Sequence, residues 1–269
     1  EEIIETQPDS ALKTLREIDY QNEKSDRNKA LYGVLMFKAL DKNYLTLAPD
    51  SLINFSIKFY QDKNDNEKLG EALFYKGRSY KYAYKNENAT KCYIESLDKL
   101  ADSRNYSLLA KIYSDLASIS INQNDIEEAR KKLIISEKYL IKSGKTKDAL
   151  YKKLDIGNTY KLQKNYNKAL ELFKYALIES TDSLLTGQAI QEIGLTFFYI
   201  NQYDSAIINL RKSIQFPFVE NNMAIRLYAL SDSFFELKQL DSAFIYAAKS
   251  LTFPANFYTK KECYRILAN

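Results

Sequence analysis

The chain has 269 residues, of which 45% are hydrophobic and 28% charged, a globular composition that excludes intrinsic disorder. Its 7 Gly and 4 Pro are too few for a β-sandwich or for the glycine-rich loops of an α/β enzyme, so the composition favours helices. There is no His and there are only 2 Cys, which argues against His-based proton transfer and against His- or Cys-liganded metal sites. We therefore expect no enzymatic activity, no metal and no cofactor.

Charge and hydropathy limit the kinds of partner that we expect this chain to bind. The formal net charge of +4 is small and does not by itself call for nucleic acid or an anionic membrane. No apolar run approaches the roughly 18 to 20 residues of a membrane span, and the acidic first residues 1–5 do not resemble a signal peptide.

Cys92 and Cys263 fall inside helical patterns far apart in the sequence, so we expect two free thiols.

Helix starts mark the first part of the chain. Pro8-Asp9-Ser10 and Pro49-Asp50-Ser51 have the residue order of a helix N-terminus, and the first leaves no room for a full helix before it. Between them, residues 30–44 carry apolar side chains at helical spacing. We expect an irregular connection of extra residues before Asp50.

From residue 67 onward the sequence repeats itself. Gly77, Gly157 and Gly194 are each followed by an aromatic residue three positions later and by an alanine twelve positions later. The alanine series is Ala89, Ala129, Ala169, Ala206 and Ala243, in steps of 40, 40, 37 and 37 residues. A small residue lets two helices cross closely while an aromatic ring fills the space beside it. The period therefore predicts pairs of packed helices, with Pro217 and Pro254 following the ends of two of them.

This pattern resembles the tetratricopeptide repeat (TPR), most clearly from Leu73 to Ser96 and from Gly157 to Ala176. The resemblance covers nearly the whole chain and implies an all-α, right-handed TPR superhelical solenoid of about thirteen or fourteen antiparallel helices. We expect one solenoid made of a half repeat 1–27, an atypical repeat 28–66, TPR-like repeats 67–103, 104–144, 145–182, 183–219 and 220–255, and a truncated repeat 256–269. Because neither end has an evident cap, we interpret the chain as a fragment of a longer protein; the alternative is that the half repeats are the caps.

The resemblance also implies a binding surface. In TPR proteins the first helix of each pair lines a concave groove, and amide and tyrosine side chains there suit a peptide segment. The groove residues implied by repeat position are Arg78, Lys81, Tyr82, Lys111, Ser118, Asn122, Tyr151, Asp155, Asn158, Lys161, Gln188, Gln191, Tyr199, Tyr228, Asp232 and Phe235. The alternative at any one position is a solvated helix face. The carboxylate clamp of chaperone-binding TPR domains is absent, because its positions hold Phe74, Arg78, Ser118, Tyr151 and Asp155.

One segment is strongly basic. Residues 130–174 contain thirteen Lys or Arg against four acidic residues. We place most of these lysines on second helices and loops, where nucleic acid or acidic lipid would meet the convex side. We favour a solvated face, because Arg, the usual phosphate ligand, is almost missing there.

The expected function is that of a non-enzymatic protein–protein interaction module. Residues 8–12 and 40–44 resemble bacterial TPR regulators and envelope proteins, which implies the sensing or scaffolding part of a larger protein and favours a periplasmic or envelope-associated location over a cytoplasmic one. Two alternatives remain. One is a receptor for a short signalling peptide that controls a DNA-binding output, gripping the peptide through Asn122, Asn158, Gln188 and Gln191. The other is nucleic-acid binding through the basic convex face.

Overall fold

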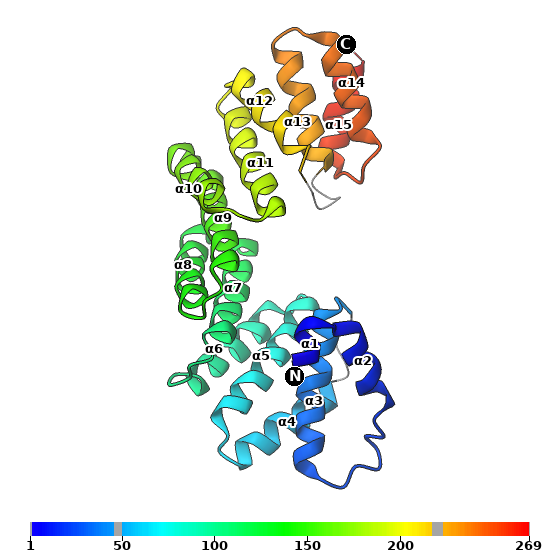
Figure 1. Ribbon diagram of the computed structural model, residues 1–269, viewed down its shortest axis with the longest axis vertical. Helices are drawn as coiled ribbons and strands as arrows, with labels where there is room; N and C mark the ends of the chain where they lie inside the picture. The colour runs from blue at the N-terminus through cyan, green and yellow to red at the C-terminus, as the bar shows by residue number, and fades with distance from the viewer. Residues whose placement is uncertain (1, 46–49, 217–222, 269) are drawn as a thin grey trace. The chain divides into compact units, whose positions relative to one another are not determined.

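The computed structural model describes residues 2–45, 50–216 and 223–268, and every regular element within them is an α-helix (Figure 1). The all-α architecture expected from the composition is confirmed. The chain divides into two compact units, the first ending at Asn124 and the second beginning at Asp125. None of the helices in the described ranges has both the length and the apolarity that a bilayer span requires.

The first unit consists of helices that pack against their neighbours in sequence (Figure 1). In its described residues these are α1 (Glu2–Thr6), α2 (Pro8–Glu17), α3 (Asp26–Lys42), α4 (Asp50–Asp62), α5 (Asn66–Tyr82), α6 (Asn86–Lys99) and α7 (Tyr106–Asn122). Two pairs, α3 with α4 and α5 with α6, have the extensive contact of the predicted repeats. The short α1 precedes Pro8 and buries Ile4 against α2 and α3, so the chain starts with more helix than we expected.

In its described residues the second unit continues the pattern with three more pairs of a first and a second helix, with one further helix before them and one after them (Figure 1). Its described elements are α8 (Ile126–Lys142), α9 (Thr146–Leu162), α10 (Tyr166–Glu179), α11 (Ser183–Tyr199), α12 (Tyr203–Ser213), α13 (Met223–Glu236), α14 (Leu240–Leu251) and α15 (Phe257–Leu267). The odd-numbered helices α9, α11, α13 and α15 also contact one another in succession. We call α3, α5, α7, α9, α11, α13 and α15 the first helices. The described residues thus hold fifteen helices, slightly more than the thirteen or fourteen expected.

Short polar residues set the helix starts. Side chains that accept a hydrogen bond from the backbone N–H three residues later belong to Ser25, Asp65, Asn105, Asp125, Asn165, Asp182 and Asn256. Asp204 and Asp241 lie inside the first turns of α12 and α14, where their charge favours the helix dipole. Pro254 follows the end of α14 as expected, whereas Pro217 lies outside the described residues.

The helix ends explain how a chain with few glycines forms so many turns. Residues with positive φ follow successive helices, and they are Tyr44, Asn64, Tyr84, Asn124, Gly144, Lys164, Asn201 and Lys238. A left-handed residue closes a helix by turning the next N–H groups back toward its last carbonyls. Glycine usually occupies this position, but among these eight residues only Gly144 does.

The core follows the predicted small and large alternation. All five alanines of the series, from Ala89 to Ala243, are fully buried, as expected for small residues at the crossing of two helices. Serines seven positions after such alanines have a structural role that the spacing alone did not reveal. Ser96 Oγ donates to the carbonyl of Gly70 at 2.6 Å, and Ser250 Oγ donates to that of Ala224 at 2.8 Å. Each bond spans 26 residues and ties the second helix of a pair to the start of the first.

Candidate functional site

The first helices α3, α5 and α7 surround a pocket of about 270 Å³ in the first unit. Its lining residues are Asp41, Lys42, Tyr44, Arg78, Tyr82, Lys111, Ser114 and Asp115. Three of the predicted groove residues, Arg78, Tyr82 and Lys111, are thus brought together. Ser118 and Asn122 lie further along α7 and do not line this pocket.

A network of ion pairs connects residues that line this pocket. Arg78 forms ion pairs with Asp41 on α3 and with Asp115 on α7, the second at 3.3 Å from Nε. Asp115 also pairs with Lys81 Nζ at 2.5 Å and accepts a hydrogen bond from Tyr93 Oη at 3.0 Å. Burial opposes ionisation of Arg78, but the two carboxylates outweigh it and raise the pKa of its guanidinium. The negative charges of Asp41 and Asp115 are therefore balanced by Arg78 and Lys81, and these ion pairs join α5 to α3 and to α7.

A second group of charges borders the pocket. Glu5 on α1 pairs with Lys38 at 3.3 Å and with Lys42 at 2.5 Å. Burial alone would raise the pKa of Glu5, but the Lys42 hydrogen bond and the charges of Lys111, Lys42 and Lys38 lower it to about 2. The charges of three lysines thus act on this one carboxylate, and two of them pair with it directly.

Asp41 and Asp115 are not among the residues predicted from the sequence. Asp115 is 7% exposed although it carries a charge, and it interrupts the apolar stretch of α7 between Leu108 and Ile121. A charged residue on the apolar side of an otherwise hydrophobic helix must be paired, because an unpaired buried charge is strongly destabilising. That interruption was the available signal, and its partner Arg78 lies on the neighbouring first helix.

In the second unit, Asn158 on α9 stands out among the predicted groove residues. Its Oδ1 atom is buried and has no hydrogen-bond partner within the residues that the structure describes. The side chain as a whole is partly exposed. A buried amide oxygen without a partner costs free energy, which a ligand's N–H group can recover. Gln188, on the adjacent α11, is likewise partly exposed.

Three other predicted residues of this unit are held by protein groups. Tyr151 Oη donates to Asp182 at 3.2 Å, and burial together with this carboxylate raises its pKa to about 12. Asp155 accepts a hydrogen bond from Lys152 at 2.6 Å. Lys161 forms an ion pair with Glu192 on α11. These side chains lie on first helices, as predicted, but their polar groups already have partners.

The position of Gln191 differs from the one expected from the sequence. We expected its side chain on the surface, but it is only 4% exposed. Its Oε1 accepts a hydrogen bond from Nε of Arg226 on α13, and the fully buried Arg226 also donates to the Ser213 carbonyl at 3.0 Å. Burial lowers the pKa of the Arg226 guanidinium. Gln191 therefore faces the neighbouring helix, where it satisfies a buried cation.

The remaining predicted residues gather between α11, α13 and α15. Tyr199 is half exposed, whereas Tyr228 is only 7% exposed and packs edge-on against Phe198 and Tyr258. Asp232 accepts a hydrogen bond at 2.9 Å from Arg265, whose guanidinium lies over the Phe235 ring. Burial and neighbouring acidic groups raise the pKa of Asp232 despite this bond. This surface is aromatic and acidic, and its buried members serve packing.

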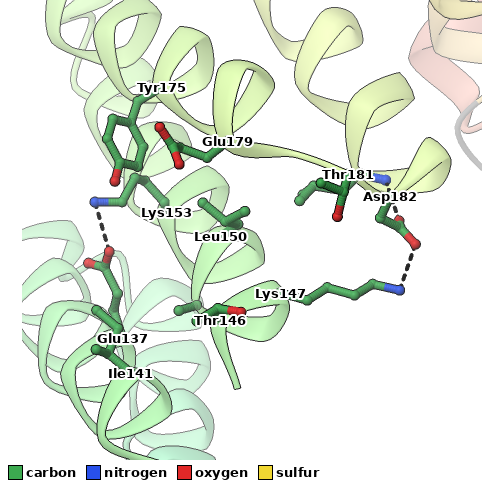
Figure 2. Close-up of a pocket in the computed structure, with 12 residues that line it drawn as sticks. Glu137, Ile141, Thr146, Lys147, Leu150, Lys153, Tyr175, Glu179, Thr181 and Asp182 are labelled. Atoms are coloured by element: carbon green, nitrogen blue, oxygen red, sulfur yellow. Dashed lines mark hydrogen bonds and ion pairs between the residues drawn. The ribbon is translucent and has the colours of Figure 1, made fainter. Parts of the chain in front are cut away.

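A pocket in the second unit, larger than the one between α3, α5 and α7, was not expected from the sequence. It measures about 410 Å³ and lies where α8 and α10 end and where α9 and α11 begin (Figure 2). It is lined by Glu137, Ile141, Thr146, Lys147, Ala149, Leu150, Lys153, Tyr175, Glu179, Thr181, Asp182 and Leu185. None of the predicted groove residues is among them. The pocket depends on the extended backbone of Ser180, which separates α10 from α11 and which no repeat position encodes.

Ion pairs close two sides of this pocket. Figure 2 shows Lys153 pointing between Glu137 and the ring of Tyr175, with its Nζ 2.8 Å from Glu137 and 4.6 Å from the ring centroid. On the other side Lys147 pairs with Asp182 at 2.6 Å. These pairs neutralise both lysines, and buried Ala149 and Leu185 leave the base apolar.

The basic segment shows a similar pairing of charges. Four of its outer lysines form ion pairs with nearby acids: Lys131 and Lys132 with Glu128, Lys147 with Asp182, and Lys168 with Glu171. Arg130 is buried and donates to Thr159 at 2.9 Å, so it joins α8 to α9. Both cysteines are buried, and neither forms a disulfide in the described part of the chain, as expected. In the described ranges no group of three or more His, Cys, Asp or Glu side chains is placed to hold a metal ion.

Comparison with known proteins places the fold. The apo form of the quorum sensor NprR from B. thuringiensis superimposes with a TM-score of 0.72 at 13% identity, over 99% of this chain and 80% of that one. NprR in complex with its cognate peptide NprX gives 0.62 at 14% identity, over 93% and 78%. A signal transduction ATPase from Pyrococcus horikoshii with a tetratricopeptide repeat sensor gives 0.70 at 15% identity, over 92% and 38%. The chain thus has a TPR-like helical solenoid fold.

Sequence comparison reaches less far. Human intraflagellar transport protein 88 homolog is 29% identical over 105 residues, which are 38% of this chain. The chain spans only 12% of that protein's length. No protein-family model matches the sequence.

Proposed function

We propose that this chain is a non-enzymatic interaction module that binds an extended peptide segment of a partner on the faces of its first helices. The observation that carries the proposal is the buried, unpartnered Oδ1 of Asn158. This atom lies at a predicted ligand-facing position on a first helix. A peptide backbone N–H is the donor that such an oxygen lacks.

The comparisons support this proposal at the level of the fold. NprR, which shares the arrangement of helices, is described in complex with its cognate peptide. In the present chain the partner's identity is open, and we propose a sensing or scaffolding role within a larger bacterial regulatory or envelope protein. The alternative is a receptor for a short signalling peptide that controls a DNA-binding output.

Peptide selection followed by titration tests the proposal. A phage-displayed library of random dodecapeptides is selected on the full 269-residue chain. Enriched peptides are then synthesised with a fluorescent label and titrated by fluorescence anisotropy. We expect micromolar binding, and Asn158→Ala should weaken it about tenfold because one hydrogen bond inside the site is lost.

Asn167→Ala is the matched control. It removes the same amide from an exposed position on α10, a second helix of the same unit, and should leave affinity unchanged. Equal binding by the wild type and the Asn158→Ala variant, with the same helicity by circular dichroism, would remove Asn158 from the site. A failure to select any peptide would refute the proposed function itself.

A further inference from the structure

We propose that the pocket formed by α8, α9, α10 and α11 is a second binding site, which receives a large apolar side chain and an adjacent lysine or arginine from a segment of a partner protein. Its volume of about 410 Å³ lies within the usual range for a ligand pocket. The site is separate from the first-helix faces of the proposed function, because none of the predicted groove residues lines it. The two sites can therefore be tested independently.

The apolar part of the pocket provides the first reason. Ala149 and Leu185 are 5% and 1% exposed at its base, and Figure 2 shows Leu150 between the two ion pairs of the pocket. Ile141 and Tyr175 also line the pocket, although they are 56% and 48% exposed. Exposed apolar side chains beside a cavity mark a surface on which a partner can bury a group of its own. Because apolar surface extends from the base to these two exposed residues, the pocket suits a protein segment.

Four of the five charged side chains in the lining are paired with one another. Lys153 Nζ lies 2.8 Å from Glu137, and Lys147 Nζ lies 2.6 Å from Asp182. The hydrogen bond from Lys147 lowers the pKa of Asp182, which therefore keeps its negative charge at neutral pH. Both lysines thus have a carboxylate of the protein as partner, and they do not call for an anionic ligand.

Glu179 is the fifth charged side chain of the lining, and it is exposed. In the part of the chain that the structure describes, no side chain forms an ion pair or a hydrogen bond with it. Glu179 is also the last residue of α10, whose last turn contains no basic residue. The C-terminal end of a helix carries a partial negative charge, to which Glu179 adds its own. A cation is therefore the ligand group that complements this end of the pocket.

The apolar and the acidic features are close enough for one short segment to reach both. Tyr175 and Glu179 are four residues apart on α10, so they share a face of the helix at a separation of about 5–6 Å between their β-carbons. An apolar side chain of the ligand that packs on Tyr175 therefore leaves the residue next to it within reach of Glu179. Thr146 and Thr181 also line the pocket, and their hydroxyl groups suit the ligand's backbone.

Capped hexapeptides titrated against the full 269-residue chain test this inference. The probe is Gly-Ser-Phe-Lys-Ser-Gly, and matched peptides carry Gln or Glu in place of its Lys, or Ala in place of its Phe. With ¹⁵N-labelled protein, we expect the probe to shift the backbone amide signals of Leu150, Thr181 and Leu185. The peptide without Phe should bind about tenfold more weakly or less, because it buries no ring. The Gln peptide should bind about two- to fivefold more weakly than the probe, as expected for an exposed ion pair, and the Glu peptide more weakly still.

Glu179→Gln separates the contribution of the charge from that of the cavity. This variant should bind the probe and the Gln peptide equally, while its affinity for the Gln peptide stays that of the wild type. Glu95→Gln changes an exposed glutamate on the second helix α6 and should leave the preference for Lys intact. Asn158→Ala should also leave it intact, because Asn158 does not line this pocket.

Three results would overturn this inference. The first is the absence of signal shifts with millimolar probe, or shifts confined to residues outside the pocket. The second is equal binding of the Lys, Gln and Glu peptides by the wild type. The third is a preference for Lys that persists in the Glu179→Gln variant. None of these results bears on the peptide site at Asn158, which has its own test.

Discussion

Gly157 on α9 leaves the space that the ring of Phe173 on α10 occupies, because a β-carbon built on this glycine would overlap the ring. The same relation recurs in the first unit, where a β-carbon on Gly77 would lie 2.5 Å from Cε1 of Tyr93. The two pairs come from different repeats but have the same separation of 16 residues. The repeated glycine is therefore a volume requirement of the crossing between the two helices of a pair.

Gly157→Leu should destabilise the protein by about 3 kcal/mol or more, because four added carbons must displace a fully buried ring. Urea unfolding monitored by circular dichroism measures the change in the free energy of unfolding. A variant that unfolds like the wild type would refute the assigned contact.

A substitution of Phe173 tests whether residues 157 and 173 compete for the same space. Phe173→Ala alone should cost about 3–5 kcal/mol by leaving a cavity. In the double variant the leucine has room to fill part of that cavity, so the two costs should sum to more than the measured loss. Additive costs would mean that the two positions do not share space.

The helix ends permit a stabilising prediction. Lys164 has φ +60° after α9, a conformation in which a β-carbon is strained. Lys164→Gly should therefore raise the free energy of unfolding by about 0.5–1 kcal/mol. Gln163→Gly, one residue earlier at φ −87°, should lower it, because glycine there only adds freedom to the unfolded chain. The reverse order of stability would contradict the assigned turn.

The repeat was predictable because its residues are constrained by volume at fixed spacing. Ala169 and Phe173 have to be small and large wherever a second helix crosses a first one, and the sequence therefore reveals the pairs without any knowledge of the partner surfaces. The short α1 was not predictable in this way, because five residues carry too little periodicity to identify a helix.

The site was harder to predict because repeat position does not determine whether a polar side chain meets solvent or a neighbouring helix. Gln191 and Asn158 occupy comparable first-helix faces, yet Gln191 is buried because Arg226 approaches it from α13. Whether Gln191 is buried therefore depends on the residue at position 226, which is 35 positions away in the sequence. The larger pocket depends on the backbone at Ser180, for which the repeat pattern contains no signal.

Glu5 makes a prediction about acid stability. Its pKa is about 2 in the folded protein against an ordinary value of 4.5, so its ion pairs stabilise the fold above about pH 4.5 and are lost as the pH falls toward 2. The carboxylate is 40% exposed, so solvent screening reduces the contribution to about 1 kcal/mol. Glu5→Gln should therefore lower stability at pH 7 and flatten its decline between pH 4.5 and 2, measured by urea unfolding across that range. An unchanged pH profile would show that the lysines do not hold this carboxylate in solution.

Asn158 and Gln191 should respond in opposite ways to the same change, although both are amides on first helices. Gln191→Ala removes the oxygen that accepts from the buried Arg226 and should cost about 1–3 kcal/mol, because part of a desolvated guanidinium loses its partner. Asn158→Ala removes a buried oxygen that has no partner in the described part of the chain, so stability should stay within about 0.5 kcal/mol or rise. Chemical unfolding of both variants measures the difference.

Binding separates the two residues further. Asn158→Ala should weaken peptide binding at unchanged stability, which is the behaviour of a residue that contacts ligand. Gln191→Ala should affect binding only to the extent that it shifts α11 against α13, and Arg226→Met, which removes the cation while keeping an unbranched side chain of similar length, should ease the cost of losing Gln191. If Gln191→Ala instead left stability unchanged and abolished peptide binding, Gln191 would be a ligand residue after all, and its contact with Arg226 would be dispensable for the fold.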